Sequence, residues 1–126
     1  EIENFSSLIS ITTITRVNGT ETKRTVAGTI FGKDDPRIVK IDGYRVDAYP
    51  SGYMLICSFL DKPRVIGPVC LILGDNGINI AGMQVGREKV GGEAVMVLNV
   101  DSPVSDELIE EIKRVENIFD IMLVKL

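Results

Sequence analysis

The sequence contains no histidine and no tryptophan, and only two of its 126 residues are cysteines. Without histidine, the chain has no imidazole to act as a general base, to bind a metal ion or to complete a Ser-His-Asp arrangement. Cys57 and Cys70 do not form a C-x-x-C pair, so a cysteine-ligated metal site lacks its other ligands. We interpret both thiols as small buried apolar groups in a reducing compartment, and we expect the cytoplasm.

Long apolar runs, an excess of basic residues and nucleotide-binding glycine motifs are also missing. The apolar runs VIGPVCLIL and AVMVLNV are too short and too interrupted to span a bilayer. The formal net charge is −4 and acidic and basic residues are interspersed, which leaves no basic face for a phosphate backbone. Neither G-x-G-x-x-G nor a P-loop occurs. We therefore expect no membrane partner, no nucleic-acid partner and no catalysis in this chain.

The sequence does contain enough hydrophobic residues, 44% of the total, to form a folded core. The alternation in FSSLISITTITRV, residues 5–17, predicts a strand with one solvated face. Asn18-Gly19 then favours a tight hairpin turn, and ETKRTVAGTIFG is the return strand. KDDP ends that strand, and RIVKIDGYRVDAYP supplies two more around an Asp-Gly turn. Four short strands bury little surface, so residues 1–50 are expected to form a poor independent domain that is rich in β-strands.

From residue 51 onward, strands and helices are predicted to alternate. GYMLICSFL is a continuous apolar strand, and after DKPR the apolar residues recur at helical spacing until GDNG stops the helix. INIAGMQVGRE and EAVMVLNV predict two further strands, Ser105 is a good N-cap for a second helix, and IFDIMLVKL is the last strand. This order is the β-α-β-β-α-β pattern of an α+β, ferredoxin-like sandwich over residues 51–126. Such a sheet has one open face and exposed edges, which invite pairing with a second copy.

The loop in SFLDKPRVIGPV is the main candidate for a ligand site. Asp61 lies where the strand ends and would suit an ammonium group, while the backbone N–H groups at the helix start near Val65 favour a carboxylate. Together they would hold an amino acid. The alternative is that Asp61 only caps the helix and that Lys62 and Arg64 are solvated. Asn79 either bonds its own turn or presents its amide beside the first loop.

The stretch LDKPRVIGPVCLILGDNGINIAGMQVGR resembles the ACT domain, a small-molecule-sensing ferredoxin-like module whose usual start is Asp-x-Pro-Gly-Val-Ile-Gly. GGEAVMVLNVDSP, and PRIVKIDGYRVDAYPSGYMLI before it, resemble the C-terminal end of the D-3-phosphoglycerate dehydrogenase family, which catalyses the first committed step towards serine. ENFSSLISI through VAGTIFG resembles the later part of an intervening, substrate-binding-type regulatory domain that precedes the ACT domain in long bacterial forms. The similarity covers nearly the whole chain.

The resemblance implies a regulatory fragment with an intervening domain ending near residue 50 and an ACT domain over residues 51–126. The catalytic domain of this NAD-dependent oxidoreductase, with its acid-base histidine and its NAD, would lie upstream, so no cofactor is expected in this chain. In the family, L-serine binds between two ACT domains and inhibits the enzyme. The implied partners are therefore L-serine or another amino acid, a second copy in a homodimer or larger assembly, and the catalytic domain of the same chain.

By position, the resemblance implies that the effector is bound by a small set of residues, which are Phe59, Asp61, Arg64, the backbone around Val65 and Ile66, and Asn79 of the neighbouring copy. Arg64 departs from the family, which usually has a glycine there to admit the ligand and positive φ angles. Phe59 departs too, because the family often has a polar residue. Arg64 either recruits a ligand carboxylate or leaves the site degenerate. The alternatives are thus a structural oligomerisation module and the matching region of an iron-sulfur L-serine dehydratase.

Overall fold

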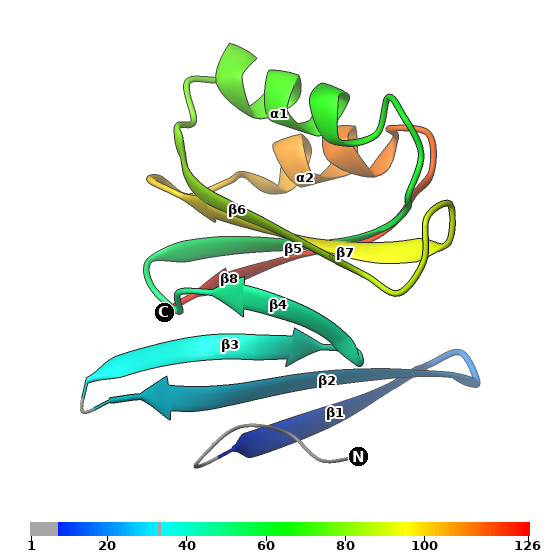
Figure 1. The fold of residues 1–126 in the computed structure, drawn as a ribbon. Helices are drawn as coiled ribbons and strands as arrows, with labels where there is room; N and C mark the ends of the chain where they lie inside the picture. The colour runs from blue at the N-terminus through cyan, green and yellow to red at the C-terminus, as the bar shows by residue number, and fades with distance from the viewer. Residues whose placement is uncertain (1–7, 33) are drawn as a thin grey trace.

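A computed structural model describes residues 8–32 and 34–126 of the protein. In that part of the chain, eight strands form two antiparallel sheets and two helices lie on one of them (Figure 1). The first sheet has the order β1-β2-β3-β4, with the strands Ile9–Val17, Thr20–Phe31, Asp35–Ile41 and Tyr44–Ala48. The second sheet has the order β6-β7-β5-β8, and its strands are β5 Tyr53–Leu60, β6 Ile80–Arg87, β7 Glu93–Val100 and β8 Ile118–Lys125. The helices are α1 Ile66–Asp75 and α2 Asp106–Lys113.

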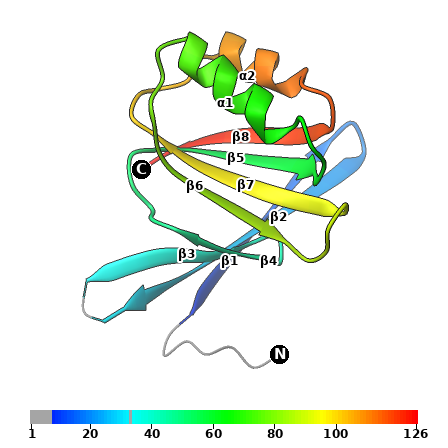
Figure 2. The same ribbon diagram turned by 45° about the horizontal axis from the view of Figure 1, so that its top comes forward.

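The second half of the chain confirms the predicted α+β, ferredoxin-like pattern. Its elements follow the order β5, α1, β6, β7, α2, β8, and both helices cover the same face of the second sheet (Figure 2). Leu55, Val69 and Ile112 are fully buried between the helices and the sheet. The Ser105 hydroxyl accepts a hydrogen bond from the Leu108 N–H at 3.2 Å, as expected for the N-cap of α2. Neither helix is long and apolar enough to cross a membrane.

The first half forms the predicted strands and turns. Asn18 and Gly19 have φ angles of 50° and 79°, the left-handed pair that a tight hairpin needs. The sequence predicts a first strand that begins at residue 5, and residues 5–7 lie outside the described residues. Within the described residues, β1 starts at Ile9. The predicted break at KDDP is shorter than expected, because β3 already begins at Asp35. The return strand has the predicted length of 12 residues, and β2 begins one residue before the predicted segment ETKRTVAGTIFG.

The first sheet covers the face of the second sheet that we expected to be open. Figure 1 shows three layers: the helices, the second sheet and the first sheet. Ile41 and Ala48 of the first sheet pack with Met54, Ile56 and Val97 of the second in one buried cluster. The continuous apolar runs of β5 and β7 follow from this arrangement, because both of their faces are buried. The N-terminal strands share their core with the ferredoxin-like half.

Charged side chains also join the two sheets. The Arg24 guanidinium on β2 lies 2.9 Å from the Asp42 carboxylate and donates a hydrogen bond of 2.6 Å to Asp120 on β8. The Nε and Nη2 atoms of Arg24 are buried and lack well-oriented hydrogen-bond partners among the described residues, although Nε is the atom close to Asp42. We therefore regard the Nη1 bond to Asp120 as the directed link and the Asp42 contact as mainly electrostatic.

Candidate effector site

The loop between β5 and α1 lies against the hairpin that joins β6 and β7. The Asp61 backbone N–H donates to the Gly92 carbonyl at 2.8 Å. The Asp61 Oδ2 atom accepts a hydrogen bond from Arg87 Nη1 at 2.7 Å and a longer one, 3.4 Å, from the Gly91 N–H. The Arg87 hydrogen bond lowers the pKa of Asp61, burial opposes this and the Gly91 N–H assists it. Asp61 is therefore an ionised carboxylate in a fixed position.

The start of α1 next to this carboxylate has no side-chain cap. Val65 is the N-cap residue, its side chain is buried, and it makes no capping hydrogen bond. The first turn of the helix contains no acidic residue. The alternative interpretation required Asp61 to cap the helix. The Asp61 carboxylate does not cap it and pairs with Arg87 instead. Because first-turn N–H groups carry partial positive charge, this helix end favours an anion a few residues from a carboxylate that favours a cation.

Arg64 has a backbone conformation that favours glycine. Its φ angle is 66°, in the left-handed region that costs a residue with a side chain about 1–2 kcal/mol. Its side chain is exposed. The loop therefore carries backbone strain at Arg64 and a cation at its surface.

Phe59 and Ile66 contribute to the loop from beneath. Phe59 is 0% exposed and belongs to the core cluster between the helices and the second sheet. Ile66 is half-buried and packs against the same cluster. Within one copy, the Phe59 side chain supports the loop and does not line its surface. The prediction that these two residues and Val65 bind an effector remains a prediction.

Asn79 lies at the other end of the sheet from Asp61. Its amide donates to the Asp101 carboxylate at 2.8 Å, in the turn before β6 and just after β7. Asp61 lies at the opposite end of β6, beside Arg87. Eight strand residues at about 3.3 Å each separate the two ends by about 25 Å. One copy therefore does not bring Asp61 and Asn79 together, and a site that uses both needs a second copy.

The comparison with known families agrees with this geometry. The ACT domain family matches residues 53–117, from the first residue of β5 to the residue before β8. This chain belongs to the ACT domain family. Its loop from Asp61 to Ile66 is thus the strand-to-helix loop of an ACT domain, and the first sheet packs on the face of the ACT sheet away from the helices.

The chain is similar to the C-terminal part of several enzymes named D-3-phosphoglycerate dehydrogenase. It is 43% identical to the one from Methanocaldococcus jannaschii over 98% of this chain and 23% of the relative. The chain is 41% identical to the enzyme from Bacillus subtilis, over 88% of this chain and 21% of the relative. It is 42% identical to the enzyme from Archaeoglobus fulgidus, over 99% of this chain and 23% of the relative. The chain thus spans less than a quarter of the length of these relatives.

Two features of the ACT domain were missed by the sequence analysis. Arg87 and Gly91, the partners of the Asp61 carboxylate, are 26 and 30 residues away from it along the chain. Only the pairing of β6 with β7, which places Arg87 opposite Ala94, brings them to the loop. The signal in the sequence that could have indicated this partner was the cationic residue Arg87 at the end of a predicted strand.

The second missed feature is a pocket between the linker that follows β4 and the start of β6. It has a volume of about 430 Å³, and its lining includes Tyr49, Gly82 and Asp101. The Asn99 amide donates to the Tyr49 carbonyl at 2.8 Å and to the Ser51 carbonyl at 3.4 Å, which fixes the linker to β7. We assign Asn99 a role in holding the two sheets together.

The two cysteines contribute no reactive group to the ACT domain. Cys57 is fully buried on β5, and burial raises the pKa of its thiol to about 12. Burial also raises the pKa of Cys70 on α1. Within residues 8–32 and 34–126, no three carboxylate or thiol groups come together in a way that would hold a metal ion.

Proposed function

We propose that this chain is the regulatory end of a D-3-phosphoglycerate dehydrogenase of the cytoplasm and that it binds an amino acid, L-serine, for feedback inhibition. The observation that carries the proposal is the fixed, ionised Asp61 beside the uncapped start of α1. A carboxylate and a helix N-terminus offer opposite charges at neighbouring positions, which matches the ammonium and carboxylate groups of an amino acid. The names of the relatives supply the enzyme and hence serine as the end product.

In this proposal the Asp61 carboxylate accepts hydrogen bonds from the ammonium group of the ligand. The first-turn N–H groups near Val65 and Ile66 donate hydrogen bonds to the carboxylate of the ligand. Arg64 is placed at the surface of the loop to attract that carboxylate. Catalysis belongs to the parent enzyme, whose NAD and acid-base residues lie in domains outside this chain.

The second half of the site is proposed to come from another copy. β6 is an edge strand of the ACT sheet, and its Met83 and Val85 are 45% and 39% exposed. If two β6 strands pair antiparallel, the start of one lies next to the end of the other. Asn79 of the second copy then comes to the end of the sheet where Asp61 and Arg87 lie. The same pairing removes two exposed sheet edges.

Thermal unfolding of this chain with L-serine and with D-serine tests the proposal. We expect millimolar L-serine to raise the melting temperature, D-serine to have little effect, and Asp61→Ala to abolish the shift while the dimer persists in sedimentation. If neither L-serine nor any other amino acid stabilises the wild-type chain, the proposed function is wrong.

A second candidate function is an oligomerisation module whose loop binds no ligand. Two observations favour it: Phe59 is wholly buried where a ligand contact was expected, and the positive φ of the loop is occupied by Arg64. This alternative predicts a dimer that persists in Asp61→Ala and a melting temperature that no amino acid changes.

A further inference from the structure

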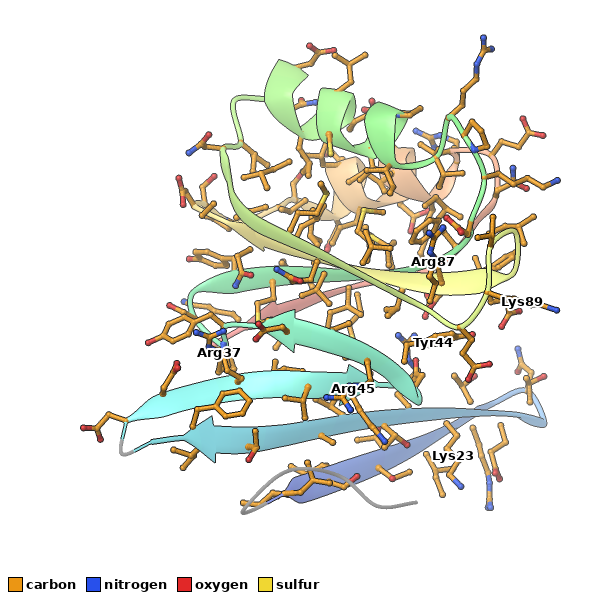
Figure 3. All side chains as sticks on the ribbon, viewed as in Figure 1. Lys23, Arg37, Tyr44, Arg45, Arg87 and Lys89 are labelled. Carbon is orange, nitrogen blue, oxygen red and sulfur yellow. The ribbon has the colours of Figure 1, made fainter. Side chains whose placement is uncertain are left out.

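Two adjacent residues at the end of β6 face opposite sides of the ACT sheet. Arg87 pairs with Ala94, which belongs to the core under the helices, and its guanidinium holds Asp61. Gly86 pairs with Val95, which belongs to the core shared with the first sheet. In Figure 3, Arg87 lies above the β6–β7 hairpin and Tyr44 of β4 lies below it. The end of β6 therefore contacts the effector loop on one face and the first sheet on the other.

Gly86 touches β4 with no space to spare. A Cβ at this position would lie 2.5 Å from the Arg45 carbonyl oxygen, 3.0 Å from Val46 Cγ1 and 3.2 Å from Tyr44 Cβ. Only a residue without a side chain allows the two backbones to approach in this way. Because packed protein interiors are dense and poorly compressible, a shift of the end of β6 must also shift β4.

A ligand would affect the contact between β6 and β4 through the Asp61–Arg87 ion pair. Both hydrogen bonds that Asp61 accepts from Arg87 and Gly91 end on Oδ2. The Asp61 side chain is 16% exposed and that of Arg87 is 49% exposed. An ammonium group that binds the same carboxylate shares its single negative charge with Arg87, and this weakens the bond to Arg87.

We propose that Arg87 is an internal competitor for the ammonium-binding carboxylate and that Gly86 transmits its release to β4. Ligand binding at Asp61 loosens Arg87, the end of β6 relaxes, and the packing of β4 against it changes. The ligand part of this inference rests on the proposed function, whereas the coupling between the ion pair and β4 is a property of the chain without ligand.

Hydrogen exchange of residues 44–48, with and without L-serine, tests the inference in the wild-type chain and in Arg87→Met. We expect serine to speed exchange of β4 in the wild type. In Arg87→Met, exchange should already be fast without ligand and serine should not change it further. Serine should also bind Arg87→Met about two- to fivefold more tightly, because one competing ion pair of ordinary strength is gone.

Arg16→Met is the matched control, because it removes the same charge from an exposed pair with Glu21 at 2.9 Å in the first hairpin. It should leave β4 exchange and serine affinity unchanged. Asp61→Asn removes the charge from the other partner of the Asp61–Arg87 pair, so it should also speed β4 exchange. This variant tests the coupling if Arg87→Met folds poorly.

Unchanged β4 exchange in ligand-free Arg87→Met and Asp61→Asn would overturn the coupling, whether or not serine binds. Weaker serine binding by Arg87→Met would overturn the competitor role and leave Arg87 as a support for Asp61. If the wild type binds no amino acid while both variants speed β4 exchange, the proposed function fails and the coupling stands.

Discussion

Arg64 shows how one residue can keep a loop shape that it does not favour. Its φ angle of 66° is easy for glycine and strained for arginine. Glycine loses more backbone entropy on folding, so relief of strain and this loss partly cancel. We expect Arg64→Gly to increase the free energy of unfolding by about 0.5–1 kcal/mol, which corresponds to a melting temperature about 2–5 °C higher.

Lys62→Gly is the control for this substitution, because Lys62 is exposed in the same loop and does not have a positive φ angle. It should lower the melting temperature slightly. Equal losses of stability in both variants, measured by thermal unfolding, would show that the conformation of Arg64 is not strained.

Asp61 makes stability depend on pH in a direction set by Arg87. The Arg87 hydrogen bond lowers the pKa of Asp61 in the folded chain below the value of about 3.9 expected when it is unfolded. The ionised form is therefore favoured by folding, so its contribution is complete above about pH 4 and is lost as the pH falls through the folded pKa. We expect the difference in melting temperature between wild type and Asp61→Asn to be largest at pH 7 and to close towards pH 2.

The same comparison in an Arg87→Met background is the control for the pH dependence. Without the guanidinium, Asp61→Asn should change the melting temperature much less, and the difference should depend little on pH. A difference that stays constant from pH 7 to pH 2 in the wild-type background would contradict the assigned role of Arg87.

At the scale of single residues, the sequence predicted the conformation and the type of chemistry better than the partners. Asp61 was expected to matter and Arg64 to occupy a glycine position, and both depend on local pattern. Arg87 and Asp61 are 26 residues apart along the chain. The hydrogen bond between them depends on the register of β6 against β7, which local sequence patterns do not specify. Phe59 is buried in the core between the helices and the ACT sheet, and a continuous apolar run on one strand does not reveal which element covers each of its residues.

Among the elements, β4 and β6 form a contact that constrains sequence without a hydrogen-bonded ladder. They belong to different sheets, yet the backbone of β4 lies directly against Gly86. A methyl group at this position must displace β4, and overpacking of this kind costs about 1–3 kcal/mol. We expect Gly86→Ala to lower the free energy of unfolding by that amount in urea denaturation.

Gly82→Ala on the same strand is the matched control. A Cβ at Gly82 would lie 3.5 Å from its nearest neighbour, the Asn99 Oδ1 atom, which is an ordinary contact. The loss of stability should therefore be small. If both alanine variants are equally stable, the tight approach of β4 to β6 is not present in solution.

The order and type of the elements were predictable because local signals agreed with the fold. Asn18-Gly19 adopts the turn that its residues favour, and Ser105 caps α2. The face of the ACT sheet that the first sheet covers was not predictable. An apolar run on β5 or β7 shows burial on both faces, but it does not identify the element that provides it.

On the scale of the whole molecule, the two halves share one of the two buried clusters that residues 8–32 and 34–126 form. Met54, Ile56, Val95 and Val97 of the ACT sheet pack against the first sheet. Burial of an apolar side chain of this size stabilises a protein by about 1.5–3 kcal/mol. We expect residues 51–126 alone to unfold at a lower temperature than the full chain and to form larger assemblies in light scattering.

The same fragment with Ile56→Thr and Val97→Thr is its control, because threonine suits a strand and tolerates water. It should assemble less than the unmodified fragment. A fragment with the oligomeric state and melting temperature of the full chain would show that the shared cluster contributes little. The assignment of residues 1–50 and 51–126 to separate domains stays a prediction.

The positions of the two thiols have a practical consequence for measuring how this protein opens. Cys57 is fully buried on β5, between β7 and β8, whereas Cys70 lies half-buried on α1. A thiol reagent reaches Cys70 when the helix loosens, but it reaches Cys57 only when the ACT sheet itself comes apart. The relative labelling rates of the two cysteines therefore separate local opening near the effector loop from global unfolding, without any introduced cysteine.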